Sequence, residues 1–262
     1  MRITRSVILV LIITLWCVPV LAGCGQQKEK TGNRTGIIGA MEEEVDSLQQ
    51  ELQNPKTTSS AGMIFYEGTL DGADVVIVKC GIGKVNAGTC AQLLINDFGV
   101  DCIINTGVAG SLDAEIDIGD IVISTDAVQY DFDLTPLGYQ PGELDGIGTP
   151  YLPADDALRR SAVDAVAQCA PEIHAFEGRI CTGDRFVASD EQKQTIVDEF
   201  GGLCCEMEGG AIAQICCQNN VPYVIMRAIS DKADGSAQMD YPSFEHEAAR
   251  RCAAIVRYMV SH

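Results

Sequence analysis

The sequence has few basic residues and very few histidines. Its 262 residues hold 18 Lys and Arg against 37 Asp and Glu, a formal net charge of −19, and only 3 His. A surface with this charge repels phosphate backbones, so nucleic-acid binding is not expected, and we attribute the acidity to solubility. The histidines stand alone and no two cysteines have the C-x-x-C spacing, so the sequence gives little support for a zinc site.

Cysteine, in contrast, is abundant. There are twelve, among them the vicinal pairs Cys204-Cys205 and Cys216-Cys217. An exported protein can pair such thiols, whereas apolar neighbours favour their use as small buried hydrophobic residues. The second interpretation suits most of them, and the sequence leaves their redox state open.

No apolar run is long enough for an ordinary membrane span. Arg2 and Arg5 precede about 15 apolar residues, short of the ~20 that a span requires. The run ends in Leu21–Cys24 (LAGC), the small-residue cleavage site of a secretory signal. This site resembles a bacterial lipobox, in which Cys24 carries the lipid.

These features divide the chain into three parts. We expect a lipoprotein signal peptide over residues 1–23, a polar flexible tether over residues 24–35 and one folded domain over residues 36–262. The expected location is the extracytoplasmic face of a bacterial membrane, contacted through the lipid anchor only. An uncleaved membrane anchor is the alternative.

Short apolar runs alternate with longer helical periods from Thr35 onward, which predicts an α/β fold with a parallel or mixed sheet. The segment 130–153 has four Pro and four Gly and predicts a long functional or interfacial loop. The predicted strands cover 36–40, 64–69, 75–79, 102–106, 121–125, 176–181 and 223–229, and the predicted helices cover 42–52, 85–98, 155–167, 191–200, 208–217 and 244–260.

Three acidic groups lie where a predicted strand or helix meets a loop: Glu42–Glu44, Glu206–Glu208 and Asp231. Ligands of open α/β sheets bind outside the carboxyl ends of the strands, where Asp231 is expected. The first group could equally be first-turn acids favoured by the helix dipole, and the second is ambiguous alone. Asp231 ends an apolar strand and needs partners. Together the groups predict a polar ligand whose bonds are handled by acids and bases.

Two glycine-containing segments follow predicted strands. Gly81–Asn86 fails as a phosphate loop, because Val78 and Val85 replace the Gly and the Ser or Thr of that motif, and Asn86 replaces the third Gly of a dinucleotide fingerprint. What remains is a turn that lets backbone approach a ligand or a neighbouring strand, or serves packing alone. The small residues of Asn105–Ser111 would let a flat ligand lie against backbone.

Six motifs together resemble the 5′-methylthioadenosine/S-adenosylhomocysteine nucleosidases, in the family's order and over essentially the whole folded part. The resemblance implies a nucleoside phosphorylase-like fold, a three-layer α/β sandwich with a central mixed β-sheet, and no cofactor or metal. It also implies an adenine nucleoside substrate and a homodimer. The motifs are Gly36–Val45, Cys80–Val85, Asn105–Gly110, Gly119–Val122, Glu206–Glu208 and Arg227–Asp231.

Carried over by position, the resemblance implies that Asp231 is the acid that protonates adenine N7 and Glu44 the base that activates water. Glu208 would hold the ribose hydroxyls, and Ser230 would orient Asp231. Further substrate contacts are implied at Gly110, Phe186, Val187 and Met207.

The chain departs from the family in two places. Val108 and Ser111 stand where Ser and Gly are more usual. Leu137, Tyr139 and Asp145 occupy a loop that in the family reaches across the dimer to the 5′-substituent. The preference at the 5′ position is therefore open.

The implied chemistry is hydrolysis of an N-glycosidic bond through an oxocarbenium-like ribose, with an acid and a base whose pKa values are pushed apart. A phosphorylase is the nearest rival, but no Arg stands beside Glu42–Glu44 in the sequence to hold phosphate. Two further functions are compatible with the sequence: a nucleoside-binding lipoprotein without catalysis, and a nucleosidase for 6-amino-6-deoxyfutalosine.

Overall fold

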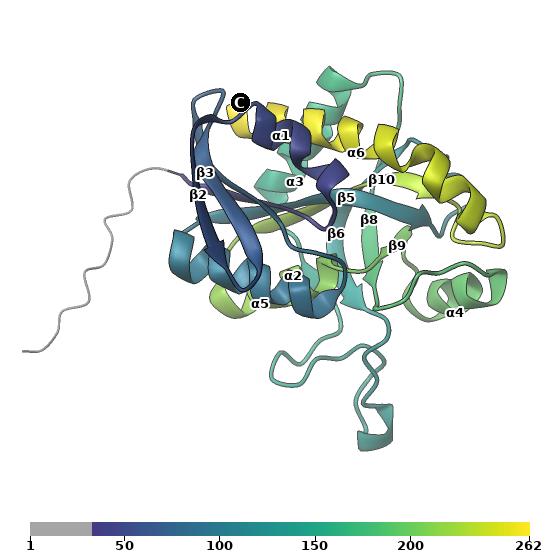
Figure 1. Ribbon diagram of the computed structural model, residues 1–262. Helices are drawn as coiled ribbons and strands as arrows, with labels where there is room; N and C mark the ends of the chain where they lie inside the picture. The colour runs from purple at the N-terminus through teal and green to yellow at the C-terminus, as the bar shows by residue number, and fades with distance from the viewer. Residues whose placement is uncertain (1–32) are drawn as a thin grey trace, which may run out of the picture. The chain divides into compact units, whose positions relative to one another are not determined.

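The computed structural model describes residues 33–262, and its elements are labelled in Figure 1. The predicted signal peptide, residues 1–23, and its Cys24 lie outside the described residues. The end of the predicted tether belongs to the fold, because the Arg34 guanidinium donates to the carboxylate of Asp74 at 2.9 Å.

One mixed sheet runs through the described residues with helices on its faces. Its strands are β1 (Thr35–Gly39), β2 (Gln53–Ser60), β3 (Met63–Leu70), β4 (Ala73–Lys79), β5 (Cys102–Ser111), β6 (Ile121–Gln129), β7 (Leu152–Pro153), β8 (Ala175–Thr182), β9 (Cys204–Glu206) and β10 (Tyr223–Asp231). The α-helices are α1 (Asp46–Gln50), α2 (Lys84–Leu93), α3 (Asp156–Cys169), α4 (Asp190–Phe200), α5 (Gly209–Asn219) and α6 (Ala237–Ser261).

The sheet closes on itself at one end. Its order is β10–β6–β8–β9–β5–β1–β4–β3–β2, and β10 also pairs with β5. Strands β5, β10, β6, β8 and β9 therefore form a ring, from which β1, β4, β3 and β2 extend as an open sheet. The predicted α/β fold with a central mixed sheet is confirmed.

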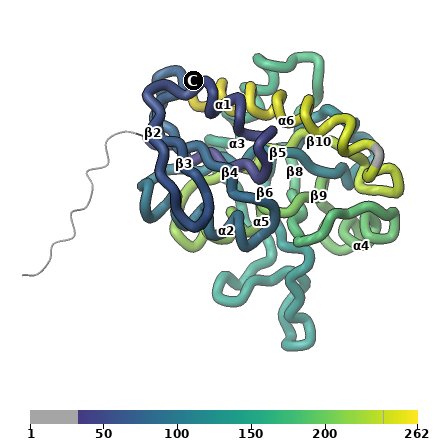
Figure 2. Tube along the Cα trace, viewed as in Figure 1, coloured from purple at the N-terminus to yellow at the C-terminus, as the bar shows by residue number. Residues whose placement is uncertain are grey.

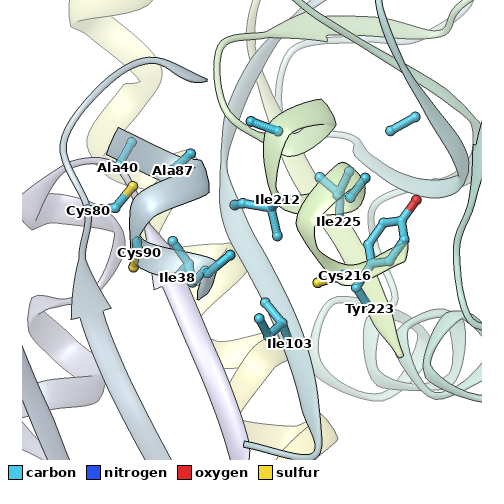
Figure 3. Close-up of a cluster of buried hydrophobic side chains, with 14 of the residues drawn as sticks. Ile38, Ala40, Cys80, Ala87, Cys90, Ile103, Ile212, Cys216, Tyr223 and Ile225 are labelled. Carbon is cyan, nitrogen blue, oxygen red and sulfur yellow. The ribbon is translucent and has the colours of Figure 1, made fainter. Parts of the chain in front are cut away.

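Helices cover both faces of the sheet. Figures 1 and 2 show α1, α3 and α6 over one face and α2 and α5 over the other. Successive strand residues point to opposite faces: Ile37 belongs to the same buried cluster as Val256 of α6, whereas Ile38 belongs to the cluster that contains Cys90 of α2 and Cys216 of α5. Figure 3 shows this second cluster, where the cysteines fill the role of small hydrophobic residues that the sequence favoured.

Several predicted boundaries are corrected by the structure. The strand predicted over 102–106 continues to Ser111, so the small-residue segment is strand rather than turn. The helix predicted over 42–52 is a 3₁₀ turn, Glu42–Glu44, followed by α1. Strand β2 was missed because its sequence is polar and mostly exposed, as an outer strand can be.

Candidate active site

A cavity of about 330 Å³ lies where β1, β5, β9 and β10 end. All eight residues that the sequence assigned to catalysis or substrate binding line it: Glu44, Gly110, Phe186, Val187, Met207, Glu208, Ser230 and Asp231. Sequence reasoning gave no role to other residues that line it, among them Met41, Ile82, Arg185, Cys205, Glu206, Arg227 and Tyr241. Within residues 33–262, no group of His, Cys, Asp or Glu is arranged to hold a metal ion.

Glu44 is the inward-facing member of the first acidic group. One carboxylate oxygen accepts from the backbone N–H groups of Ala40 at 2.6 Å and Met41 at 3.0 Å, and the other from that of Val108 at 3.2 Å. Burial raises the pKa of Glu44, while Arg227 and these backbone donors act in the opposite direction. Arg227 and the three backbone donors therefore favour the ionised form of Glu44, against the effect of its burial.

Gly107 on β5 makes room for this arrangement. A Cβ atom at this position would lie 2.5 Å from an Nη atom of Arg227 and 2.6 Å from an Oε atom of Glu44. The sequence suggested that backbone in this segment is bare to receive a flat ligand. At Gly107 the structure shows instead that the space beside the backbone is filled by the side chains of Glu44 and Arg227.

Arg227 is a fully buried cation in the middle of β10. It donates to the carboxylate of Glu206 and, at 2.6 Å, to the side-chain oxygen of Asn105. Glu206 also accepts from the backbone N–H groups of Glu208 at 3.0 Å and Gly209 at 2.7 Å. A further donor to its carboxylate is the hydroxyl of Thr182. Glu206 thus neutralises Arg227 and is fully occupied. A lone arginine in an apolar strand is the sequence signal that could have predicted this pair, because a buried charge needs a partner.

Glu208 stands immediately before α5, with one carboxylate oxygen 2.9 Å from the backbone nitrogen of Gly83. The other oxygen lies 3.6 Å from Arg227. Burial raises the pKa of Glu208 to about 7, with Arg227 lowering it and Glu206 raising it. The glycine turn at Gly81–Asn86 therefore brings backbone to a carboxylate of the cavity wall.

Asp231 is the last residue of β10 and has a different environment from Glu44. Its Oδ1 accepts from the backbone N–H of Ala233 at 2.8 Å, and its Oδ2 is 2.9 Å from the hydroxyl of Ser230. Burial raises the pKa of Asp231, the hydrogen bonds from Ala233 and Ser230 act in the opposite direction, and the charges of Asp240 and Asp234 raise the pKa further. Acidic neighbours favour the protonated form of Asp231, whereas Arg227 favours the ionised form of Glu44.

The rim of the cavity is apolar and partly exposed. Phe186 packs edge-to-face on Tyr241 with ring centroids 5.7 Å apart, and the Tyr241 hydroxyl lies 3.1 Å from the sulfur of Met41. Ile82 and Phe186 remain 55% and 45% exposed. The cavity thus combines a charged floor with an apolar mouth, which suits a ligand with both polar and apolar parts.

Comparisons with known proteins give one consistent result. A family model described as the phosphorylase superfamily matches residues 34–261. The 5′-methylthioadenosine/S-adenosylhomocysteine nucleosidase of Shewanella sediminis is 42% identical over 224 residues, which cover 85% of this chain and 96% of the relative.

Solved structures agree. The nucleosidase of Neisseria meningitidis, in complex with methylthio-immucillin-A, has a TM-score of 0.84 at 37% identity, covering 87% of this chain and 99% of its own. The Colwellia psychrerythraea nucleosidase, in complex with adenine, has a TM-score of 0.84 at 39% identity, covering 88% of this chain and 95% of its own. A futalosine hydrolase of Helicobacter pylori has a TM-score of 0.82 at 30% identity, covering 87% of this chain and 97% of its own.

These comparisons correct the prediction of export. The relatives matched over nearly their full length are named as nucleosidases, and none of these names describes a lipoprotein or a membrane protein. The prediction of a signal peptide and of a lipid anchor at Cys24 is therefore wrong. It rested on Arg2 and Arg5, a short apolar run and the four residues Leu21–Cys24. Within residues 33–262, no helix combines the length and hydropathy needed to cross a membrane.

Proposed function

Since the chain belongs to the phosphorylase superfamily and, within it, to the 5′-methylthioadenosine/S-adenosylhomocysteine nucleosidases, we propose that it hydrolyses the N-glycosidic bond of these two nucleosides. The products are adenine and the 5′-thio-substituted ribose. The observation that carries the proposal is that Glu44, Glu208 and Asp231 line one cavity, with an arginine near Glu44 and acids near Asp231. We assign the activity to residues 36–262.

Asp231 acts as the general acid. Its Oδ1 accepts from the backbone N–H of Ala233 and its Oδ2 accepts from the Ser230 hydroxyl, and these two hydrogen bonds hold the carboxyl group in place. The neutral carboxyl group donates to N7 of adenine, and the exocyclic amine donates to a carboxyl oxygen. A 6-oxopurine offers an acceptor there instead, which is why an aspartic acid suits a 6-aminopurine. A general acid of this kind contributes roughly 10²–10⁴ to the rate.

Glu44 acts as the general base and Glu208 holds the sugar. As the glycosidic bond breaks, the ribose develops oxocarbenium character and water attacks it, while Glu44 takes the proton of that water. Glu208 accepts from the 2′- and 3′-hydroxyl groups. Phe186 stacks on the purine, Met207 packs on the nucleoside, and the backbone at Gly110 and Val187 contacts the substrate.

Hydrolysis rather than phosphorolysis follows from the state of Arg227. The sequence showed no arginine beside Glu44, but the fold brings Arg227 there from β10. Its guanidinium already donates to Glu206 and Asn105 and is neutralised by the first of these. A phosphate ion beside Glu44 would therefore meet the carboxylates of Glu44, Glu206 and Glu208, and the charge of Arg227 is already offset by Glu206.

A second substrate is favoured by one comparison. The match to a futalosine hydrolase from Helicobacter pylori extends over 87% of this chain at 30% identity, so a related 5′-substituted adenosine is the alternative substrate. A lipoprotein that captures nucleosides without catalysis is no longer a candidate, because it required the lipid anchor.

We also propose that the chain works as a homodimer. The exposed large apolar side chains include Ile82 and Phe186 at the cavity mouth, Val85 next to it in α2, and Leu137 in the loop over residues 130–153. Val85 is 80% and Leu137 73% exposed. A second copy would cover this rim and exclude water from the 5′ end of the substrate.

The test is release of adenine from 5′-methylthioadenosine and S-adenosylhomocysteine, with and without phosphate. We expect release that does not need phosphate and falls by roughly 10²–10⁴ in Asp231→Asn and in Glu44→Gln, because each removes a proton-transfer group. Glu42→Gln is the matched control, since Glu42 pairs with Lys79 at the surface, 2.7 Å away. Strict dependence on phosphate, or full activity of Asp231→Asn, would refute the assignment.

A further inference from the structure

Two cysteines lie side by side at the wall of the cavity, which Cys205 lines and behind which Cys181 is buried. Cys181 of β8 and Cys205 of β9 are direct partners in a parallel strand pair. Neighbouring strands lie about 4.7–4.9 Å apart, within the 4.4–6.8 Å between Cα atoms that a disulfide tolerates. Direct partners project to the same face, and both side chains pack in the small cluster that contains Val187 and Ala233. Cys204, one residue earlier, packs in the cluster on the other face.

The two thiols differ in access. Cys205 lines the cavity, interacts with Asp231, and has its sulfur 3.7 Å from the carbonyl oxygen of Gly110. Cys181 is completely buried behind it, and its sulfur occupies the space that a Cβ at Gly202 would need. A small reagent in the cavity therefore meets Cys205 first.

We propose that Cys181 and Cys205 form a dithiol that a peroxide entering the cavity converts to a disulfide, and that this disulfide reversibly inactivates the site. The Cys205 thiolate attacks one peroxide oxygen, the O–O bond breaks, and a sulfenic acid and one water form. The Cys181 thiolate then attacks the sulfenic sulfur, a second water leaves, and the S–S bond forms. Two thiols are oxidised to one disulfide, and hydrogen peroxide is reduced to two waters.

The disulfide would displace the carboxylates of the site by moving β9. A disulfide requires Cβ atoms about 3.5–4.5 Å apart, closer than two neighbouring strands hold them, so β9 is drawn toward β8. Strand β9 ends at Glu206, which neutralises Arg227, and Glu208 follows two residues later. Inactivation rests on the proposed nucleosidase activity, whereas formation of the disulfide does not.

The experiment treats the reduced full-length chain with hydrogen peroxide at about pH 9, because burial raises the pKa of both thiols and slows the reaction at neutral pH. Free thiols are then alkylated and the protein is digested for mass spectrometry. We expect a peptide pair linked through Cys181 and Cys205, at least a tenfold loss of adenine release, and recovery with dithiothreitol. Absence of the linked pair in the wild type would overturn the proposal, whether or not the protein releases adenine.

Two variants distinguish inactivation by the Cys181–Cys205 disulfide from inactivation by oxidation elsewhere in the protein. Cys181→Val fills the same space without the second thiol, so Cys205 continues to a sulfinic acid that dithiothreitol does not reduce. We expect normal activity before peroxide and no recovery afterwards. Cys204→Val, the control on the other face, should form the linked pair and recover as the wild type does. Recovery of Cys181→Val to the wild-type extent would contradict the proposal.

Discussion

The carboxylates of the cavity differ mainly in their nearest charged neighbour. Glu44 and Asp231 are both buried and both have a raised pKa, but Arg227 opposes that shift only at Glu44, whereas acids reinforce it at Asp231. The contrast supports the division into base and acid that the sequence resemblance implied. The resemblance found the acids, but it could not show that Glu206 is occupied by Arg227, because that pair joins residues of two different strands.

Glu208 offers a prediction for stability, since its pKa is raised by burial from an ordinary value of 4.5 to about 7. Between these values the folded protein holds a proton that the unfolded chain releases, so the free energy of unfolding falls as pH rises through this interval. Glu208→Gln removes that dependence and keeps an acceptor for the Gly83 N–H. We expect its free energy of unfolding, relative to wild type, to rise by on the order of 2 kcal/mol from about pH 5 to about pH 8.

Urea unfolding of both proteins at the two pH values measures this difference. Glu199→Gln, at an exposed position of α4, is the control, and its free energy of unfolding should differ little from that of the wild type at either pH. A Glu208→Gln curve that stays parallel to wild type across the interval would show that Glu208 ionises normally in the folded protein.

At the scale of elements, β5 positions both ends of the site. Its Gly107 lies against Glu44 and Arg227, and its Gly110 lies against Asp231, with a Cβ at Gly110 reaching within 2.8 Å of that carboxylate. Three residues of extended strand separate the two glycines by roughly 10 Å, enough for a nucleoside between acid and base. Small residues were visible in the sequence, but the side chains that need the space come from segments distant in the chain.

Gly107→Ala tests this role of β5. The added methyl group meets the side chains of Glu44 and Arg227 at less than van der Waals distance, so both side chains and their hydrogen bonds must shift. We expect at least a tenfold loss of kcat and a loss of about 1–3 kcal/mol in the free energy of unfolding, the usual effect of overpacking. Steady-state kinetics and urea unfolding measure the two quantities.

Gly88→Ala is the matched control for this substitution. Gly88 lies in α2, and the atom nearest to a Cβ at this position belongs to Ile215, 3.8 Å away. This variant should be neutral, or slightly more stable because alanine favours a helix. Wild-type activity in Gly107→Ala would mean that the positions of Glu44 and Arg227 tolerate a shift of this size.

Element types followed from the sequence where burial dictates a pattern. The strands β1, β4 and β10 are mostly buried and rich in apolar residues, and they were predicted within a few residues. Strand β2 has no such run, because its pairing with β3 places it at the edge of the sheet, with mostly exposed side chains. The three residues of β9 are too few to show any period.

At the scale of the whole fold, closure of the sheet ring was not predictable from local patterns. It depends on β10 pairing with both β5 and β6, contacts between segments more than 90 residues apart. The family resemblance supplied the central mixed sheet, and the pairing of β5 with β9 then placed Cys205 opposite Gly110, next to Asp231. Ring closure thus brings the ends of β5, β9 and β10 to one cavity, which the end of β1 completes.

The last prediction concerns the apolar rim of that cavity. If a second copy covers Ile82, Val85 and Phe186, a charge at Val85 must be buried on association, and an unpaired buried charge is costly. Val85 is 80% exposed within one chain, so Val85→Asp leaves the fold of the single chain intact. Sedimentation equilibrium should give twice the 28.0 kDa chain mass for wild type and a dissociation constant at least tenfold higher for the variant. Gln168→Asp, which adds the same charge at an exposed position of α3 on the other face of the sheet, should have the dissociation constant of the wild type. A wild-type protein that sediments as one chain would mean that the rim stays open to solvent and that the 5′ end of the substrate is bound by residues of one subunit alone.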